Sequence, residues 1–322
     1  MKSTKQYQKI FEDYLSKKIE AKDPKNLYEP MAYILKLGGK RVRPVLVLMA
    51  ADIFGENSEE ALDAALAIEV FHNFSLVHDD IMDNAPLRRG QKTVHELWDV
   101  NTAILSGDAM LIRAYQLFEN YPGEVFREMA QLFSATAIEV CEGQQYDIDF
   151  ESREKVEIDQ YIKMIEQKTA ILVGASLKMG AIVAGASGED KTAIYRYGKL
   201  LGTAFQLQDD YLDVFGEPAL FGKKQGGDII ENKKTFLYLT AVLQADQSEA
   251  LQLEHLYSIN PKDGASKIEA VKSLFRTSGA ARRTQEEINR YTEMAFDVLE
   301  NMKLSEEKKL YLRKFGENLM NR

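Results

Sequence analysis

Apolar residues recur every three or four positions in one long segment of the first third of the chain. They are Leu62, Leu66, Val70, Phe74, Val77 and Ile81, and this spacing is typical of a helix with a buried face. Polar residues at 57–58 can cap the helix, and Glu59 and Glu60 suit the positive end of its dipole. We therefore expect this helix to run to about Asn84, before Pro86.

Prolines and glycines indicate where the other helices can begin and end. None of the seven prolines falls between Pro122 and Pro218, so long uninterrupted helices fit that region. A shorter helix is expected from Pro44, which suits a first helical position, to Gly55. No alternation of apolar and polar residues indicates strands, and the pattern predicts an all-α protein.

Two apolar stretches rich in small residues, around 169–186 and 198–214, would let helices approach one another closely. The least regular segment, Gly216 to Asn232, contains several glycines and a proline and is expected to be a long loop. No Pro/Ser-rich linker divides the chain. We expect a single domain over residues 1–322, a large bundle of roughly a dozen helices.

Composition narrows the class of protein. Hydrophobic residues make up 45% and charged residues 28%, the balance of a folded globular chain. The net charge of −9 argues against a broad surface for nucleic acid. No apolar run approaches the ~20 residues that span a membrane, and the N-terminus lacks the apolar core of a signal peptide. We expect a cytoplasmic protein, and its only cysteine, Cys141, excludes a multi-thiolate metal site.

Two acidic motifs carry the main chemical signal. They are Asp79-Asp80-Ile81-Met82-Asp83 and Asp209-Asp210-Tyr211-Leu212-Asp213. Each places its first and last carboxylate four residues apart, on one helix face, where like charges repel. A cation would relieve that repulsion, and Mg²⁺ suits the motifs because it is usually held by one or two carboxylates together with substrate phosphates.

Each acidic motif continues a polar stripe on its helix. His72 and Ser75 precede Asp79 on the first helix, and Gly202 and Gln206 precede Asp209 on the second. Two helices with matching stripes suggest two walls of one cavity, which would place the two aspartate motifs opposite each other.

Four basic clusters become candidates for substrate binding once the acidic motifs are taken into account. They are Lys40-Arg41-x-Arg43, Arg88-Arg89, Lys223-Lys224 and Lys233-Lys234. An acidic protein that binds an anionic substrate needs local cations, and arginine can clamp phosphate oxygens with paired hydrogen bonds. Carboxylates for Mg²⁺ beside cations for phosphate indicate an enzyme that acts on organic diphosphates.

The order of these motifs resembles that of the trans-isoprenyl diphosphate synthases, the polyprenyl synthetase family, from about residue 20 to the end. The resemblance rests on Gly38-Gly39-Lys40-Arg41-x-Arg43-Pro44, Asp79-Asp80-x-x-Asp83 with Arg88-Arg89-Gly90, Lys168-Thr169, and Phe205-Gln206-x-Gln208-Asp209-Asp210-x-x-Asp213. It implies an isoprenoid synthase fold with a central active-site cavity, two or three Mg²⁺ ions, isoprenyl diphosphate substrates and a homodimer.

The resemblance also implies roles for single residues. Mg²⁺ would be held by Asp79, Asp83 and Asp209, with Asp80, Asp210 and Asp213 as further catalytic residues. Isopentenyl diphosphate would be bound by Lys40, Arg43, His72 and Arg89. The allylic diphosphate would be bound by Arg88, Lys168, Thr169, Gln206, Lys224 and Lys233, of which Arg88 and Lys168 are also catalytic.

Product length in this family depends on the depth of the cavity below the first acidic motif. Phe74 lies five residues before Asp79 and is a candidate floor, and the adjacent Ser75 is small. The motif has the short two-residue spacing between its aspartates. This combination resembles geranylgeranyl diphosphate synthases, so we expect mainly a C20 product from C5 to C15 primers, with farnesyl (C15) or longer products as alternatives.

Other functions account for fewer of these features. A terpene cyclase or a head-to-head condensing enzyme would not need the residues assigned to a second diphosphate. The dipeptide His78-Asp79 suggests a phosphohydrolase, but no spaced histidine pair accompanies it. A non-catalytic partner subunit of a prenyl synthase would be expected to have lost one acidic motif, whereas both are intact.

Overall fold

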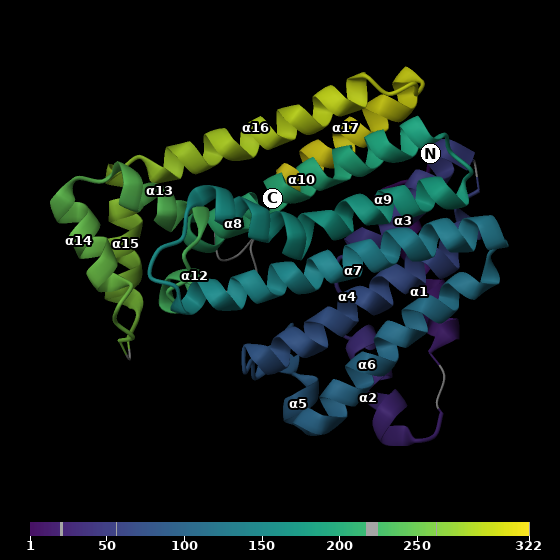
Figure 1. Cartoon of the computed structure of the whole chain (residues 1–322), viewed down its shortest axis with the longest axis horizontal. Helices are drawn as coiled ribbons and strands as arrows, with labels where there is room; N and C mark the ends of the chain where they lie inside the picture. Colours follow the sequence, from purple (N-terminus) through teal and green to yellow (C-terminus); the bar gives the residue numbers. More distant parts are fainter. Residues whose placement is uncertain (20–21, 56, 217–224, 262, 322) are drawn as a thin grey trace. The chain divides into compact units, whose positions relative to one another are not determined.

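The computed structural model describes residues 1–19, 22–55, 57–216, 225–261 and 263–321, and these are almost entirely helical (Figure 1). The first helices are α1 (Thr4–Lys18), α2 (Lys25–Lys36), α3 (Val42–Gly55), η1 (Ser58–Ala61), α4 (Leu62–Met82), α5 (Val94–Leu97), α6 (Val100–Gln116) and η2 (Leu117–Asn120). The middle helices are α7 (Gly123–Ser152), α8 (Ile158–Ile165), η3 (Glu166–Ala170), α9 (Ile171–Val183) and α10 (Gly188–Phe215). The last are α12 (Gly227–Ile230), α13 (Phe236–Gln244), α14 (Gln247–Leu256), α15 (Ala265–Thr277), α16 (Ala280–Glu300) and α17 (Glu306–Met320).

The only strands among the described residues form a two-stranded hairpin, β1 (Leu87–Arg88) antiparallel to β2 (Gln91–Lys92). The all-α class predicted from the sequence is confirmed. None of the described helices is both long enough and apolar enough to cross a membrane.

The chain forms two compact units, whose boundaries fall inside α7, α9 and α10. Unit 1 comprises Met1–Ser134 and Ser176–Thr192, and unit 2 comprises Ala135–Ala175 and Ala193–Arg322. The two acidic motifs lie in different units. The single domain over residues 1–322 stays a prediction.

Unit 1 is built around α4, the helix expected from the periodic pattern. The helix proper begins at Leu62 and ends at Met82, with the 3₁₀ turn η1 before it. Leu66, Val70 and Val77 are buried as predicted. The segment 64–71 is buried on every side, so α4 is a core helix over this length rather than a surface helix with one apolar stripe.

Small residues allow the close packing around α3, as the sequence suggested for the stretch that became α9. A Cβ at Gly180 would lie 2.1 Å from the carbonyl oxygen of Val47 on α3. Glycine at this position therefore lets the two backbones meet directly.

Unit 2 contains a separate apolar core beneath α13, α14 and α15, which are grouped together in Figure 1. Its buried residues are Val214, Ile229, Leu237, Ala241, Leu253, Val271, Leu274, Phe275 and Ala280. The loop expected over 216–232 is described at its start and from Gln225 onward, where it contains the short helix α12. This core anchors α12 through Ile229, and with it Asp228 and the following Glu231 and Lys233.

Candidate active site

In unit 1, the β1–β2 hairpin positions the arginine pair. Arg89 (φ 53°) and Gly90 (φ 75°) both have positive φ, which is the conformation of a type I′ hairpin turn. Arg88 donates to the buried carboxylate of Asp80, through Nε at 2.8 Å and Nη2 at 2.7 Å. This pairing connects the hairpin to the end of α4. The two arginines therefore have different contacts, since Arg88 binds the Asp80 carboxylate and Arg89 points elsewhere.

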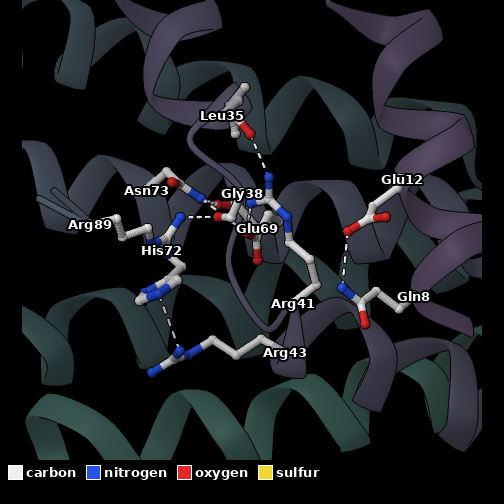
Figure 2. A network of polar contacts seen from close by, with 10 residues as sticks. All are labelled: Gln8, Glu12, Leu35, Gly38, Arg41, Arg43, Glu69, His72, Asn73 and Arg89. Carbon is white, nitrogen blue, oxygen red and sulfur yellow. Dashed lines mark hydrogen bonds and ion pairs between the residues drawn. The ribbon is translucent and has the colours of Figure 1, made fainter. Parts of the chain in front are cut away.

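Three segments of unit 1 bring cationic side chains together. Figure 2 shows Arg43, His72 and Arg89 close to one another, from α3, α4 and the hairpin turn. Arg89 donates to the carbonyl oxygen of Gly38, and Arg43 donates to Nε2 of His72 at 3.2 Å. The loop residue Gly39 has φ 126°, and a Cβ there would lie 2.8 Å from the Arg89 guanidinium. Glycine is therefore required for the loop to approach Arg89 so closely.

The cationic cluster controls the protonation of His72. Burial, followed by the charges of Arg43 and Arg89, holds the pKa of His72 well below its ordinary 6.5. Arginine can only donate, so Nε2 of the neutral ring accepts and the ring proton lies on Nδ1. Burial also lowers the pKa values of Arg43 and Arg89. A bound anion would relieve the repulsion within the cluster, which is the electrostatic character of a phosphate site.

A buried ion pair stabilises the loop between α2 and α3, and the sequence analysis did not assign it. Arg41 is 6% exposed and Glu69 on α4 is 2% exposed. Arg41 donates to the Glu69 carboxylate and to the carbonyl oxygen of Leu35 (Figure 2). Asn73 also donates to the Glu69 carboxylate at 3.2 Å. The sequence did contain one signal for this pair, since Glu69 is a single carboxylate within an apolar run of α4, and a buried carboxylate requires a partner.

The aspartates of the first motif have different surroundings. Asp80 is 1% exposed and paired with Arg88. Asp79 is half-buried, and Asp83 is exposed just after the last residue of α4. No three His, Cys, Asp or Glu side chains within the described residues form a ready metal site. The donors nonetheless fit Mg²⁺, because this ion needs only one or two protein carboxylates and takes its other oxygens from water and phosphate.

In unit 2, Lys168 and Thr169 lie in η3, a π-helical turn between α8 and α9. Gly143 on α7 allows this turn to pack closely, since a Cβ there would lie 2.3 Å from the backbone nitrogen of Lys168. Lys168 forms an ion pair with Asp147 at 2.5 Å. Single π-helical turns are frequent at functional sites because they change the direction in which side chains project.

A chain of hydrogen bonds joins η3 to the second acidic motif. Thr169 donates to Gln206 at 3.1 Å, and Gln206 donates to Asp210 at 2.9 Å. The hydroxyl of Tyr161 on α8 donates to the other oxygen of Asp210. Burial, and then the charge of Asp228, raises the pKa of Asp210 well above its ordinary 3.8, although both hydrogen bonds oppose that shift.

These side chains line a cavity of about 120 Å³ in unit 2. Five residues singled out from the sequence meet there: Lys168, Thr169, Gln206, Asp210 and Lys233. The structure adds polar residues that the sequence analysis did not assign, among them Asp147, Tyr161 and Asp228. No motif spacing points to Asp147 or Tyr161, because α7 and α8 bring them in from elsewhere in the chain.

The adjacent lysines 233 and 234 differ in their contacts. Lys233 pairs with Glu231 at 2.9 Å, and although burial opposes it, Glu231 and Asp228 raise its pKa. Lys234 instead donates to the carbonyl oxygens of Phe150 and Arg153 at 2.9 and 2.5 Å, at the end of α7. Only Lys233 was assigned from the sequence, and its neighbour is a helix cap. Lys224 lies outside the described residues.

The remaining members of the second motif are Asp209, which is half-buried, and Asp213, which is 9% exposed. The backbone N–H of Asp228 donates to the Asp213 carboxylate at 3.1 Å. The second motif is thus joined to the start of α12, as the first motif is joined to the hairpin.

The proposed chain-length residues have distinct positions in unit 1. Phe74 is 9% exposed, and its ring lies 4.8 Å from that of His78 and 5.6 Å from that of Phe71. Phe71 continues the aromatic contacts to Phe133, at 5.0 Å. Ser75 is half-buried and donates to the carbonyl oxygen of His72 at 2.9 Å. Ser75 lies four residues before Asp79, so the two residues share one face of α4, and the aromatic side chain of Phe74 is next to Ser75 in the sequence.

Several known proteins and solved structures are similar to this chain, and their functions agree with one another. The polyprenyl synthetase family profile matches residues 24–275. The geranylgeranyl pyrophosphate synthase of Geoglobus acetivorans is 37% identical over 298 residues, which are 91% of this chain and 90% of the relative. A crystal structure of a geranylgeranyl pyrophosphate synthase is 49% identical with a TM-score of 0.97, covering 100% of this chain and 99% of that one.

A further similar structure was solved as a complex with ligands. It is the geranylgeranyl pyrophosphate synthase from Corynebacterium glutamicum complexed with isoprenyl diphosphate and magnesium, which is 27% identical with a TM-score of 0.85. The alignment covers 99% of this chain and 97% of that one.

Proposed function

Because this chain belongs to the polyprenyl synthetase family, we propose that it joins isopentenyl diphosphate to allylic diphosphates of five to fifteen carbons and gives mainly geranylgeranyl diphosphate. The observation that carries this proposal is the presence of two separate groups of cationic side chains that could each hold a diphosphate. One is the arginine–histidine cluster of unit 1, and the other is the cavity of unit 2 that contains Lys168. A condensing enzyme requires two such groups because both of its substrates are diphosphates.

The isopentenyl diphosphate would lie at Lys40, Arg43, His72 and Arg89. A neutral His72 with its proton on Nδ1 is ready to take up a second proton as the diphosphate arrives. The arginines bind the diphosphate through charge-assisted hydrogen bonds, which are stronger than neutral ones. The contacts of Arg89 with Gly38 and of Arg43 with His72 fix the positions of these two side chains, which would orient the bound substrate.

The allylic diphosphate would be held by Lys168, Thr169, Gln206 and Lys233, with Lys224 and Arg88 as further contacts. Asp79, Asp83 and Asp209 would hold two or three Mg²⁺ ions, supported by Asp80, Asp210 and Asp213. When bound, these ions neutralise the charge that develops on the departing diphosphate. The relative crystallised with isoprenyl diphosphate and magnesium supports this choice of metal.

Condensation then proceeds by substrate chemistry that the side chains direct. The allylic carbon–oxygen bond breaks and leaves an allylic cation, which the double bond of isopentenyl diphosphate attacks. Loss of a proton from the new cation, with the released diphosphate as base, forms a trans double bond and a chain five carbons longer. The cationic side chains stabilise the departing diphosphate, and apolar walls exclude water from the cation.

Product length should follow from Phe74 and Ser75. A C20 product requires space for the chain beneath Ser75, bounded by the aromatic group that contains Phe74. Replacing Phe74 with Ala would remove part of this boundary and lengthen the product, whereas Ser75→Phe would block the space and shorten the product to C15.

The test is incubation of the purified protein with labelled isopentenyl diphosphate, Mg²⁺ and each of the C5, C10 and C15 primers, followed by chromatography of the dephosphorylated products. The proposal expects a C20 alcohol from the unaltered chain, longer alcohols from Phe74→Ala and a C15 alcohol from Ser75→Phe. Chelation of the metal should reduce turnover by at least 100-fold, since the departing diphosphate would lose its main source of charge neutralisation.

The competing function is that of a non-catalytic subunit that modulates another synthase. In that case no primer would be elongated with or without Mg²⁺, while binding of isopentenyl diphosphate would persist. A C15 or C25 product from the unaltered chain would leave the reaction class intact and reject the assignment of Phe74 and Ser75.

A further inference from the structure

A second, larger cavity of about 520 Å³ lies in unit 1, among α1, α2, α4 and α6. Figure 1 shows α2 and α6 next to each other at the edge of this unit. The volume lies within the range of about 300–1,000 Å³ that is typical of small-molecule sites. None of the residues assigned to the diphosphates or the metal lines it.

The cavity lies on the side of α4 that faces away from the acidic motif. Val70 and Leu66 contribute the α4 wall. Val70 precedes Asp79 by nine residues, which is about two and a half helical turns, so the two side chains point in opposite directions. Leu66 lies one turn before Val70 on the same side. Helix α4 itself therefore lies between this cavity and the acidic motif.

The walls of the cavity are apolar. Large side chains from all four helices and from η2 form them, chiefly Leu15, Met31, Leu35, Leu66, Val70 and Leu117. A ligand that fills such a space gains by removing apolar surface from water, and a small hydrophilic ion does not. The occupant must therefore carry an apolar chain.

The charged residues that line the cavity are all cationic. They are Lys18 at the end of α1, Lys22 and Arg113 on α6, and no Asp or Glu is among the described lining residues. This is unusual in a chain of net charge −9. Two of these cations have contacts within the chain: Lys18 lies 3.6 Å from Asp63 and 5.0 Å from the centre of the Tyr14 ring, and Arg113 donates to Gln116 at 3.2 Å. Three cations beside an apolar space favour an anionic head group.

We propose that this cavity is a second ligand site, for a single-chain amphiphile with an anionic head group. The apolar chain lies between α2, α4 and α6, and the phosphate or carboxylate lies against Lys18, Lys22 and Arg113. Prenyl diphosphates and fatty acids share this chemistry, and both are tested below. The site is independent of the proposed catalytic activity, because it uses none of the same residues.

Two methionines allow the two cavities to be observed separately. Met31 lines this cavity, and Met164 lines the cavity of unit 2 that contains Lys168. With methyl-¹³C methionine in the full chain, substitutions Met31→Leu and Met164→Leu assign the two signals. Titration with dodecyl phosphate should shift the Met31 signal to saturation. Dodecanol, which lacks the charge, should bind about 10-fold more weakly.

Variants test the two halves of the site. The double substitution Lys18→Gln with Arg113→Gln should weaken the dodecyl phosphate titration about 10-fold. Lys17→Gln is the control for Lys18→Gln, because it removes one positive charge from the same turn of α1 at an exposed position that does not line the cavity. Ala109→Phe, which fills the space from α6, should abolish the Met31 shift. Prenyltransferase turnover should be unchanged in the charge variants.

Parallel titrations with geranylgeranyl diphosphate and with laurate identify the source of the head group. A saturable Met31 shift with either one supports the site and names its ligand, whatever the Met164 signal does. The proposal is overturned if dodecyl phosphate, geranylgeranyl diphosphate and laurate all leave Met31 unmoved. Equal affinity in the double charge variant and in Lys17→Gln would overturn it as well.

Discussion

Residues that are adjacent in the sequence perform different tasks in this structure. Arg88 holds the buried Asp80, while Arg89 turns toward the carbonyl oxygen of Gly38. Lys234 likewise caps the end of α7, while Lys233 lies among carboxylates. The sequence motif identifies the pair in each case, and the direction of each side chain decides which member is available to a substrate.

His72 makes the stability of the protein depend on pH. Burial and the nearby guanidinium charges lower its pKa in the folded state below the ordinary 6.5. Between those two pKa values the unfolded chain binds more protons than the folded chain. The contribution of this group is therefore complete above about pH 6.5 and is lost as the pH falls below it.

We predict that His72→Gln reduces the loss of stability on acidification, by about 1 kcal/mol between pH 7 and pH 5.5. Thermal or urea unfolding at both pH values measures it. His255→Gln, which removes a histidine outside the cluster, serves as the control. An unchanged pH dependence in His72→Gln would show that this ring is already charged in the folded protein.

The same group links proton uptake to substrate binding. A diphosphate beside His72 would cancel part of the surrounding positive charge and raise the pKa of the ring. Calorimetric titration with isopentenyl diphosphate at pH 6 should therefore show proton uptake, detected as a dependence of the heat on the buffer's ionisation enthalpy. The His72→Gln variant should lose that uptake of up to one proton.

At the scale of elements, the loop between α2 and α3 depends on a helix far from it in sequence. Arg41 reaches from this loop to Glu69 on α4, and both side chains are buried. Arg41 also has φ 48°, an uncommon conformation for a residue other than glycine. The ion pair thus helps to hold the loop in its conformation, with Lys40 and Arg43 on either side of Arg41.

We predict that Arg41→Met lowers the free energy of unfolding by about 3–5 kcal/mol, because Glu69 is left buried without a partner. The double variant with Glu69→Met should recover much of that loss, as measured by urea unfolding of the four members of the cycle. Both variants should raise KM for isopentenyl diphosphate more than they change kcat. A double variant no more stable than the single one would indicate that Glu69 is not the partner that matters.

At the scale of the whole molecule, one helix face of unit 1 carries apolar residues that are open to solvent. On α6, Ile104, Leu105 and Ile112 are 40%, 60% and 59% exposed. An apolar group of this kind is typical of a surface that contacts another protein. It supports the homodimer expected from the resemblance to the family, which stays a prediction.

We predict that Leu105→Glu weakens self-association at least 10-fold, because a carboxylate would be buried in an apolar interface. Light scattering after size-exclusion chromatography measures the mass. Leu243→Glu on α13 is the matched control, since Leu243 is 65% exposed in unit 2, and it should leave the mass unchanged. A monomeric unaltered chain at micromolar concentration would reject the dimer.

The sequence by itself determined the helical class, the central helix α4 and several of the residues that meet in the cationic cluster of unit 1 and in the cavity of unit 2. Periodic apolar spacing and two acidic motifs are local features, and a helix converts local spacing directly into a shared face. Lys168, Thr169, Gln206 and Asp210 were accordingly predicted and lie together in one cavity.

The tertiary structure alone decided which partners these residues acquire. Asp147 and Tyr161 come from helices that carry no motif, and they lie beside the cavity only because those helices pack there. Glu69 lies on α4 away from its acidic motif, and it meets Arg41 only because the loop between α2 and α3 packs against that helix. The cavity bounded by Lys18 and Arg113 has the same origin, since its walls come from four helices. Contacts between distant segments depend on packing that no local spacing encodes, so they become visible only in the folded chain.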